Sequence, residues 1–586
     1  MHSPEFFRLR RGRTTLDLWL DGKNILARAN WAPGESVRIR LTYTRQLGQS
    51  GDWDFGLYSR FGNGADGMLG AYAEGSVFGL ACSVLPAARA KSPLELTWPD
   101  RTRPAEAWLD FAFGSTSRDL TLAIGQADAP DAALGEATSA LQRAGTSRRR
   151  QWRRAAQEAS RTPRLEGDWP DHWRRGLKYD LDTVRATMRD PRGILRDTWD
   201  GMQIQVPRQV LAEAALDALI LSYADPDLAR RSIAGVFRNS PAPNIPCIRE
   251  DGSVNMVTSD GQPCGTAPSW CWPAWCIALL AGSTENPLWH RSVRAGLERY
   301  LRWWLANRAA PGGWVYYLCG WESGQDASPR FNAESGGGGI EEIEPVDLTA
   351  AMAADCALLT RWRSARGLPA DDWPRNAERF ERRLQTLWRD GWFHDRRANA
   401  AIAVRDPMHL APAMHGYVNA AQRELLRRSL TRLPAHGSFS PLEWPPVALT
   451  AFEAASALGE WDWLAESVAE LCDRVWRAID APTHETGRPL PGIAHEHWPI
   501  EGEWHTEGYG WGAATALFFL RYICGIRDEP LAQCSEVAPR FPACLRRPGA
   551  VYYLRGLPRH DGRVDVTYVV APDGTVTARV AATSGE

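Results

Sequence analysis

Hydrophobic and polar positions repeat with two different periods along the chain, and the change of period divides it. Over the first 128 residues, apolar residues recur at every second position, as in Leu16–Leu20 (LDLWL), Val37–Tyr43 (VRIRLTY) and part of Trp108–Phe111. Turn dipeptides, Asp21-Gly22 and Pro33-Gly34 among them, separate these runs. Several short strands at this spacing predict an antiparallel β-sandwich over residues 1–128.

The composition changes to Ala, Leu, Gln and Arg between residues 129 and 165, which is typical of a helix. This segment contains the basic run SRRRQWRRAAQEASR, Ser147–Arg161. The run is isolated, and no interleaving of basic and aromatic residues continues on either side of it. We therefore interpret residues 129–165 as a solvated linker helix rather than as a nucleic-acid-binding element.

From residue 166 to 527 the apolar positions recur at intervals of three and four, which predicts successive amphipathic helices. No alternation of strands and helices interrupts them, and this argues against a Rossmann or TIM-barrel fold. The expected helical segments are Trp173–Met188, Val210–Tyr223, Leu297–Trp304, Asp347–Trp362, Phe380–Trp388, Val447–Leu458 and Trp463–Val475, with Trp199–Ile204, Ser269–Leu280 and Trp511–Tyr522 as further candidates.

Residues 528–586 are predicted to be rich in β-structure. Val564–Val570 and Thr575–Val580 flank the turn Pro572-Asp573-Gly574, which is a hairpin signal. We expect this C-terminal tail to return to the N-terminal sandwich.

Composition and charge narrow the possible partners. At 586 residues the chain is long enough for one large core and a smaller one. Its 68 basic and 70 acidic residues nearly cancel, so no global field attracts nucleic acid or an anionic membrane. Most of the 28 tryptophans must lie in the core, but indoles are also the preferred flat platforms for sugar faces. These features favour a small carbohydrate partner.

The cysteine pattern and the N-terminus bear on localisation. Eleven scattered cysteines without a CxxC pair predict free thiols in a reducing compartment. The N-terminal residues lack an apolar signal region, and no run of 18 apolar residues occurs in the chain. We therefore expect a soluble, cytoplasmic protein.

The stretch WESGQDASPRF, Trp321–Phe331, carries the clearest candidate chemistry. Gly324 and Pro329 break any helix here, so Glu322 and Asp326 lie on a loop between aromatic ends. A carboxyl group beside aromatic rings loses hydration when charged, which raises its pKa and allows it to donate a proton near neutral pH. General acid catalysis of glycoside cleavage requires such a group, although an ordinary polar turn would have the same composition.

This stretch resembles the acid-bearing motif of glycoside hydrolase family 63 and its relatives, the trehalases and the mannosylglycerate and glucosylglycerate hydrolases. Their pattern, W/A-E-S-G-x-D-x-S-x-R-W, differs here only at Phe331. The resemblance implies an (α/α)6 barrel, a toroid of helical hairpins, preceded by a β-sandwich. It also implies that Asp326 is the general acid, with Trp321, Glu322 and Arg330 in the substrate site.

The second carboxylate is expected downstream, where four glutamates precede the turn Gly508–Trp511. In the family that it resembles, a Glu-x-Tyr/Trp segment about a dozen residues before a Gly-Phe/Tyr-Gly-Trp turn supplies the general base. This implies Glu496 as the base and Trp498 and Trp511 as aromatic neighbours. Glu503 resembles a further sugar ligand of trehalases, and the base assignment could shift to Glu501, Glu503 or Glu507.

Three histidines in the same segment, His495, His497 and His505, raise the question of a metal site. Their spacing matches no helical i, i+4 pair with a third ligand. We therefore expect neither a metal nor an organic cofactor.

Three weaker motifs resemble pocket segments of the same family. Trp199 and Asp200 resemble a Trp-Asp pair of trehalases, although Asp200 could equally cap a helix. Asn244 and Arg249 lie in a Pro-punctuated loop, where an arginine could bind sugar hydroxyls or a carboxylate through two hydrogen bonds. Trp444 precedes two prolines, as does a sugar-stacking tryptophan of the relatives, although a buried tryptophan at a helix start would look the same.

These observations predict an inverting glycoside hydrolase that cleaves α-glucosidic or α-mannosidic bonds in a small glycoside or oligosaccharide. Asp326 would protonate the glycosidic oxygen while Glu496 activates a water molecule on the opposite face of the sugar. The alternatives are a disaccharide phosphorylase, which needs no base carboxylate, a sugar epimerase or lyase on a helical barrel, and a non-catalytic carbohydrate-binding protein. The presence of both carboxylates speaks against all three.

Overall fold

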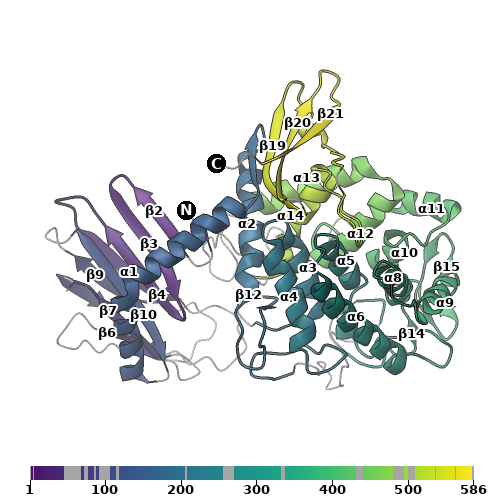
Figure 1. Ribbon diagram of the computed structural model, residues 1–586, viewed down its shortest axis with the longest axis horizontal. Helices are drawn as coiled ribbons and strands as arrows, with labels where there is room; N and C mark the ends of the chain where they lie inside the picture. The colour runs from purple at the N-terminus through teal and green to yellow at the C-terminus, as the bar shows by residue number, and fades with distance from the viewer. Residues whose placement is uncertain are drawn as a thin grey trace. The chain divides into compact units, whose positions relative to one another are not determined.

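The chain folds into two compact units, Met1–Arg161 and Thr162–Ala481 with Leu490–Glu586, which we describe separately. The computed structural model describes residues 2–3, 6–44, 67–71, 77–84, 87–91, 106–113, 118–127, 129–204, 207–254, 269–326, 328–331, 337–430, 440–478, 494–498, 508–534, 536–560 and 562–583. Figure 1 labels their helices and strands. None of the described helices is long and apolar enough to cross a membrane.

The first unit contains two antiparallel sheets and one long helix. The larger sheet has the strand order β1-β2-β3-β4-β10-β7-β6, and the smaller one has the order β5-β9-β8. The strands are β1 His2–Ser3, β2 Phe6–Arg11, β3 Thr14–Asp21, β4 Asn24–Asn30, β5 Val37–Thr44, β6 Gly67–Ala71, β7 Val77–Cys82, β8 Ala88–Lys91, β9 Glu106–Phe113 and β10 Asp119–Ala127.

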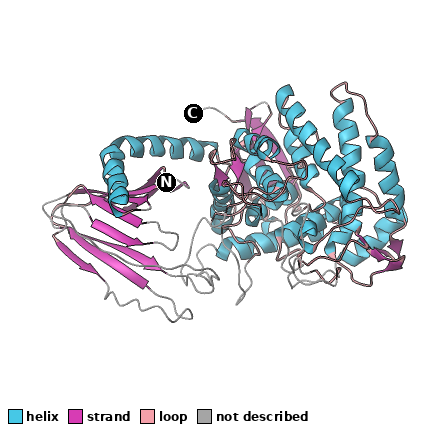
Figure 2. Ribbon diagram, turned by 90° about the horizontal axis from the view of Figure 1, so that it is seen from below, coloured by secondary structure: helices cyan, strands magenta, loops and turns pink. Residues whose placement is uncertain are grey.

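The two faces of the larger sheet bury two different sets of side chains. One face packs on the smaller sheet through a cluster that includes Trp31, Leu80 and Phe113, as the alternating pattern predicts. The other face is covered by helix α1, Pro130–Arg161, which packs on β7 and β10 (Figure 2). The basic helix therefore belongs to the sheet unit, and it ends at Arg161.

The second unit is built mainly of helices, and six largely buried helices alternate along the described chain with six whose outer faces are polar. The buried ones are α3 Leu211–Ser222, α5 Pro273–Ala281, α8 Val346–Ser364, α10 Ala411–Met414, α12 Pro445–Leu458 and α14 Ala514–Phe518. The others are α2 Asp171–Thr187, α4 Pro226–Asn239, α6 Pro287–Asn307, α9 Trp373–Gln385, α11 Ala420–Leu430 and α13 Trp461–Arg477.

The buried helices close into a ring. Helix α3 packs on α5, α5 on α8, α8 on α10, α10 on α12, and α14 returns to α3. The contact between α12 and α14 is aromatic, with the rings of Phe452 and Phe518 5.0 Å apart in an edge-to-face arrangement. In the outer layer, α13 packs on α2, so the last hairpin meets the first. This is the (α/α)6 barrel with an N-terminal β domain that the resemblance implies.

The C-terminal strands do not join the N-terminal sandwich, which corrects our expectation. Strands β19 Val551–Arg559, β20 Gly562–Val570 and β21 Val576–Ala582 form a four-stranded sheet with β11, Arg164–Gly167, in the order β11-β19-β20-β21. Their buried rings Tyr552 and Tyr568 pack around Trp169, which is 2% exposed, at the start of the helical unit. Burial of this aromatic cluster holds the tail on the helical unit.

Local assignments differ from the sequence prediction at several places. Trp199–Ile204 is not helical, because Trp199 and Asp200 form the two-residue strand β13 against β12, Met188–Arg189. Helix α9 ends at Gln385, so Trp388 lies outside it. Short strands and turns fill the connections: β14 Ile343–Glu344, β15 Trp388–Arg389, β16 Trp392–Phe393, β17 Arg396–Arg397, β18 Ala400–Ala401, η1 Pro407–Leu410, η3 Gly510–Ala513, η4 Phe519–Ile523 and η5 Ala543–Leu545.

Candidate active site

The barrel brings the candidate residues to one face. Each buried helix is preceded by a segment that returns from a polar outer helix, so all six buried helices run in the same direction and their N-termini lie together. Asp200 precedes α3, Trp270 precedes α5, Asp326 precedes α8, Trp444 caps α12, and Glu496 precedes α14. The segments that carry the predicted chemistry therefore meet at the N-terminal ends of the ring.

The acid-bearing loop begins with a single helical turn and is anchored on both sides of Asp326. Helix α7 spans Gly320–Ser323 and ends at Gly324, which has the left-handed conformation (φ 81°). The amide of the buried Gln325 donates to both oxygens of Asp406, at 3.2 Å each, and Ser328 contacts the same carboxylate at 3.5 Å. Asp406 in turn caps η1. Asp326 thus lies between two anchored neighbours.

Arg330 fixes the end of this loop through buried ion pairs. Its guanidinium group donates to Asp347 at 2.6 Å and to Asp395 at 2.8 Å, and all three side chains are fully buried. It also donates to the amide oxygen of Gln325 at 2.7 Å. Burial alone would raise the pKa of Asp395, but Arg330 and His409 hold it well below its ordinary value. This network fixes the backbone behind Asp326.

Glu322 and Arg330 are therefore scaffold residues, and this corrects the expectation that they contact substrate. Glu322 is 0% exposed. Its carboxylate accepts two hydrogen bonds from Arg308, at 2.7 and 3.1 Å, and one from the amide of Leu318 at 2.6 Å. Trp321 is only half-buried. Two charged residues of the motif, Glu322 and Arg330, therefore hold the acid loop through buried ion pairs.

Asp326 itself has the properties of a proton donor. Its side chain is exposed by surface area, yet many protein atoms surround the carboxyl group and remove part of its hydration. This desolvation raises its pKa to about 6, against a smaller opposing contribution from its own amide. The anchored loop thus presents a carboxyl group that is half-protonated near pH 6.

Glu496 lies in a short segment that is held mainly by backbone hydrogen bonds. The amides of Gly508 and Tyr509 donate to Ala494, and the amide of Trp498 donates to the carbonyl of Glu443 at 2.7 Å. The indole N–H of Trp511 donates to the carbonyl of Glu496 at 3.1 Å. The half-buried Glu496 side chain is therefore carried by the turn that the sequence motif singled out.

Two glycines of this turn allow the close approach. A Cβ atom on Gly512 would lie 2.1 Å from the carbonyl oxygen of His495, and one on Gly510 would lie 1.6 Å from the Asp217 carboxylate on α3. The turn Gly508–Trp511 is also tied to Met202–Ile204 by hydrogen bonds between their backbones. The segments before α3 and α14 are thereby locked together.

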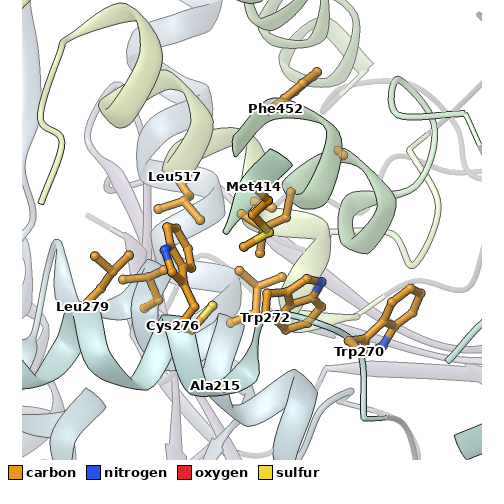
Figure 3. Close-up of a cluster of buried hydrophobic side chains, with 14 of the residues drawn as sticks. Ala215, Trp270, Trp272, Cys276, Leu279, Met414, Phe452 and Leu517 are labelled. Carbon is orange, nitrogen blue, oxygen red and sulfur yellow. The ribbon is translucent and has the colours of Figure 1, made fainter. Parts of the chain in front are cut away.

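Trp270 connects the acid loop to this turn, and the sequence analysis missed it. Its indole lies against Gly324, where an added Cβ would be 2.3 Å from the ring, and it meets Trp511 edge-to-face at 6.2 Å. Its ring centroid lies 5.3 Å from that of Trp444 and 5.9 Å from that of Trp272, on which it stacks. Figure 3 labels Trp270 and Trp272. Trp270 has a positive φ of 41°, which is unusual for a bulky residue and signals a tightly constrained position.

The predicted aromatic residues line the same region with their edges or faces buried. Trp444 stacks on the ring of His497 at 4.9 Å, and Trp511 stacks on Tyr509 at 5.0 Å. Trp498 is fully buried, and its N–H donates to the carbonyl of Gly512. Trp199 is also buried, with its N–H donated to the carbonyl of Asp190. Trp498 and Trp199 therefore pack behind the site.

A buried carboxyl group that the sequence did not single out joins the two predicted catalytic residues. Glu213, in the first turn of α3, is 2% exposed. Burial, with smaller contributions from the charges of Asp200, Glu496 and Asp326, raises its pKa to about 8. Burial raises the pKa of Tyr509 well above its ordinary value, and the charges of Glu496 and Asp326 add to this effect. Asp326 and Glu496 therefore face a common environment.

Two more carboxyl groups lie beneath Glu213. Asp200 and Asp217 are both 0% exposed. Burial raises the pKa of Asp200 to about 6, and it raises that of Asp217 well above its ordinary value, to which the charge of Asp200 adds. Asp200 is thus a buried neighbour of Glu213 and Asp217, and its role in binding substrate stays a prediction.

The remaining predicted residues divide into two groups. Asn244 is half-buried, and Arg249 is exposed on a loop whose backbone is paired with Ser253. The charges of Arg208 and Arg249 both act on the buried Cys247, and that of Arg208 also acts on the buried Tyr509. Glu501, Glu503, Glu507, His505 and Thr266–Pro268 lie outside the described residues.

Sequence reasoning missed Glu213, Asp217, Arg208 and Trp270, although one signal was available. Glu213 and Asp217 are four positions apart on a helix whose other positions are almost all apolar. Residues at that spacing share a face, and a buried acidic pair on an apolar helix points to a functional surface. Arg208 and Trp270 carried no comparable signal, because only the fold places them near the carboxylates.

No group of three or more metal-ligating side chains occurs among the described residues. Cys319, the residue before α7, is disulfide-bonded, and its partner lies outside the described part of the chain. This bond contradicts the expectation that all cysteines are free thiols, and it adds a covalent anchor to the acid loop.

Comparison with known proteins identifies the domain to which this site belongs. Residues 206–462 match the family model described as the mannosylglycerate hydrolase MGH1-like glycoside hydrolase domain. The chain contains a glycoside hydrolase domain of the six-hairpin type. The matched range includes Glu213, Trp270, Asp326 and Trp444, and it ends before Glu496. No curated protein sequence matched the chain significantly.

Two solved structures with a TM-score above 0.5 share the architecture at low sequence identity. A bacterial glucoamylase complexed with acarbose is 11% identical, with 87% of this chain and 82% of that chain covered and a TM-score of 0.51. The structure named "Putative kojibiose phosphorylase from human microbiome" is 9% identical, with 98% and 82% covered and a TM-score of 0.51. A mannosylglycerate hydrolase of family 63 from Thermus thermophilus, bound to glucose, is 18% identical over 59% of this chain and 100% of that chain, with a TM-score of 0.44.

Proposed function

We propose that this glycoside hydrolase cleaves α-linked glucose or mannose from a small glycoside with inversion of configuration. Asp326 protonates the glycosidic oxygen, and Glu496 deprotonates the water that attacks the opposite face of the sugar. The observation that carries this proposal is electrostatic: both carboxylates act on the same buried residue, Glu213. That shared effect supports the proposal that the two carboxylates, which come from different loops, serve one site.

The environments of the two carboxyl groups support this division of roles. Desolvation raises the pKa of Asp326 to about 6, which favours the protonated form that an acid needs. Glu496 is half-buried beside the stacked Trp444–His497 pair and below the turn that contains Trp511. A partly hydrated carboxylate suits a base that must stay ionised and must contact water.

Phosphorolysis is the second candidate, because one structural neighbour is described as a phosphorylase. In that reaction phosphate replaces the attacking water, and no base carboxylate is needed. A glutamate at position 496, held by Trp511, favours the hydrolytic reaction instead.

The configuration of the released sugar tests the proposal directly. The substrates are α-linked disaccharides and the α-glucosides and α-mannosides of glycerate and glycerol, each with and without inorganic phosphate. We expect hydrolysis without phosphate and initial release of the β-anomer. NMR spectra recorded before mutarotation identify the anomer that is released first. Release of the α-anomer would show a retaining enzyme, and a strict need for phosphate would show a phosphorylase.

A further inference from the structure

The charges of both proposed catalytic carboxylates act on Glu213, but the proposed mechanism gives this residue no role. It occupies the third position of α3, whose first residue is preceded by Val210 rather than by a capping side chain. Its side chain is 2% exposed, and its Oε2 atom has no hydrogen-bond partner among the described residues. A buried polar atom without a partner is costly, and it is retained most readily where a ligand supplies the partner.

The groups around Glu213 come from every segment that meets at this face. Asp217 lies one turn further along α3, and the loop before α3 contributes Asp200 and Arg208. Cys247 interacts with both Glu213 and Arg208. Among the described residues, the charged or titratable groups that act on Glu213 or on these neighbours include Asp200, Arg208, Asp217, Cys247, Arg249, Asp326, Glu496 and Tyr509, and Arg189 acts on Asp200. The charges that act on Glu213 itself are those of three carboxylates, Asp200, Glu496 and Asp326, which are acceptors when ionised.

We infer that Glu213 is a third functional carboxyl group of this site, whose hydroxyl donates a hydrogen bond to the sugar bound between Asp326 and Glu496. This inference rests on the proposed function, because it takes the sugar between these two carboxylates as the ligand.

The position of Glu213 on its helix distinguishes it from Asp217. The N-terminus of α3 points to the face where the predicted residues meet, and a residue one turn nearer that end lies about 5–6 Å closer to it. Asp217 is covered by Gly510, whose Cα leaves no room for a Cβ beside the carboxylate. Glu213 therefore faces the site, and Asp217 supports the turn.

The charge state of Glu213 suits a donor. Burial, and then the charges of Asp200, Glu496 and Asp326, raise its pKa to about 8. The start of a helix favours a negative charge, but the desolvation outweighs that effect here. At neutral pH the group keeps its proton, so it can donate to a sugar oxygen without adding a third negative charge beside the catalytic pair.

Two substitutions separate a donor from a merely space-filling residue. Glu213→Gln keeps the size and a donor group but cannot ionise, whereas Glu213→Met keeps the size and removes the donor. The matched control is Asp180→Asn, because Asp180 is a fully buried carboxyl group on α2 with a raised pKa and takes no part in the site. Thermal unfolding of all three variants measures whether each one folds.

Calorimetry measures the binding of glucose and of mannose to each variant. Steady-state kinetics measure kcat/KM on the α-glycoside panel. At pH 6 we expect Glu213→Gln to stay within about threefold of the wild type, and Glu213→Met to bind sugar about three- to tenfold more weakly. As the pH rises through about 8, the wild type should lose affinity while Glu213→Gln keeps it.

Equal affinity of Glu213→Met and wild type would overturn the inference, as would equal losses in Glu213→Gln and Glu213→Met. Failure of both sugars to bind the wild type would overturn it too, because a bound sugar is the acceptor. If the Met variant does not fold, the pH dependence of the wild type against Glu213→Gln still decides. Absence of hydrolysis on the whole panel would instead refute the proposed function, since the binding measurements do not need turnover.

Discussion

The two segments that carry the predicted catalytic carboxyl groups are built in opposite ways. The acid loop is held by buried ions: Arg330 joins Asp347 and Asp395, and Glu322 joins Arg308. The base segment around Glu496 has backbone and indole hydrogen bonds and stacked rings among its described contacts. The acid loop is thus held largely by buried ion pairs, whereas hydrogen bonds and ring contacts are described for the base segment.

The difference suits the roles that we propose, in which Asp326 is the general acid and Glu496 is the general base. Asp326 must remain protonated, and a cation beside it would lower its pKa, so each arginine of its loop is neutralised by its own carboxylates. Glu496 must remain ionised, and neutral N–H groups can hold its backbone without adding charge. Buried ion pairs can hold the loop of Asp326 without lowering its pKa, because each arginine is already paired with other carboxylates.

Loss of either carboxyl group should have the largest effect. Asp326→Asn removes the proton donor, and Glu496→Ala removes the base, so turnover on an unactivated α-glycoside should fall by ~10²–10⁴ in each case. Steady-state kinetics on purified variants with unchanged thermal unfolding would check this. A variant with near-wild-type turnover would show that the substituted residue is not catalytic. The contrast between an acid loop and a base segment would then no longer hold.

The ionic scaffold should dominate stability. Arg330→Met leaves Asp347 and Asp395 buried without their cation, which should cost about 3–5 kcal/mol of unfolding free energy. Arg299→Met, at an exposed arginine with no ion pair among the described residues, is the control and should change it by less than about 0.5 kcal/mol. Denaturant unfolding measures both, and similar values for the two variants would contradict the scaffold role.

The pH dependence should report the acid side. A general acid works in its protonated form, so kcat/KM should be highest at or below the pKa of Asp326, about 6, and should fall about tenfold per pH unit above it. Ionisation of Glu496 should set the limb at lower pH. A profile that stays flat from about pH 5 to 8 would show that Asp326 is not the acid.

Loss of one hydrogen bond to the base segment should have the smallest effect on kcat. Trp511→Phe keeps a ring but removes the hydrogen bond to the Glu496 carbonyl, so kcat should fall about three- to tenfold. Trp289→Phe is the control, because its indole makes the same kind of bond, to the carbonyl of Arg230, on the outer layer of the barrel. Equal kcat values for the two variants would mean that Trp511 does not position Glu496.

Much of the fold could be predicted because it is written in local periodicity. Helices α3, α8, α12 and α13 lie within one to three residues of the expected segments. Helix α4 was missed because small residues such as Ala234 and Gly235 form much of its buried face and blur the apolar repeat. Helix α11 was missed because it buries only Gln422, Leu426 and Leu430.

The site was only partly predictable, since a motif names residue types and not their directions. Asp326 and Glu496 both act on Glu213, a neighbour that no motif named. Glu322 and Arg330 belong to the same motif as Asp326, but they point into the protein, which only the partners Arg308, Asp347 and Asp395 reveal. The tail returned to Trp169 rather than to the sandwich because aromatic packing between distant segments leaves no periodic trace.

The glycines of the Gly508–Trp511 turn and its continuation set a limit on how this enzyme can be diversified. Any side chain at position 510 would collide with the Asp217 carboxylate, and any at 512 with the main chain at His495. In a saturation library, these two columns should therefore be almost empty among active clones, while exposed loop positions such as Arg249 accept many residues. New substrate preferences would then have to be selected from the surrounding loops, with this pair of positions left unrandomised.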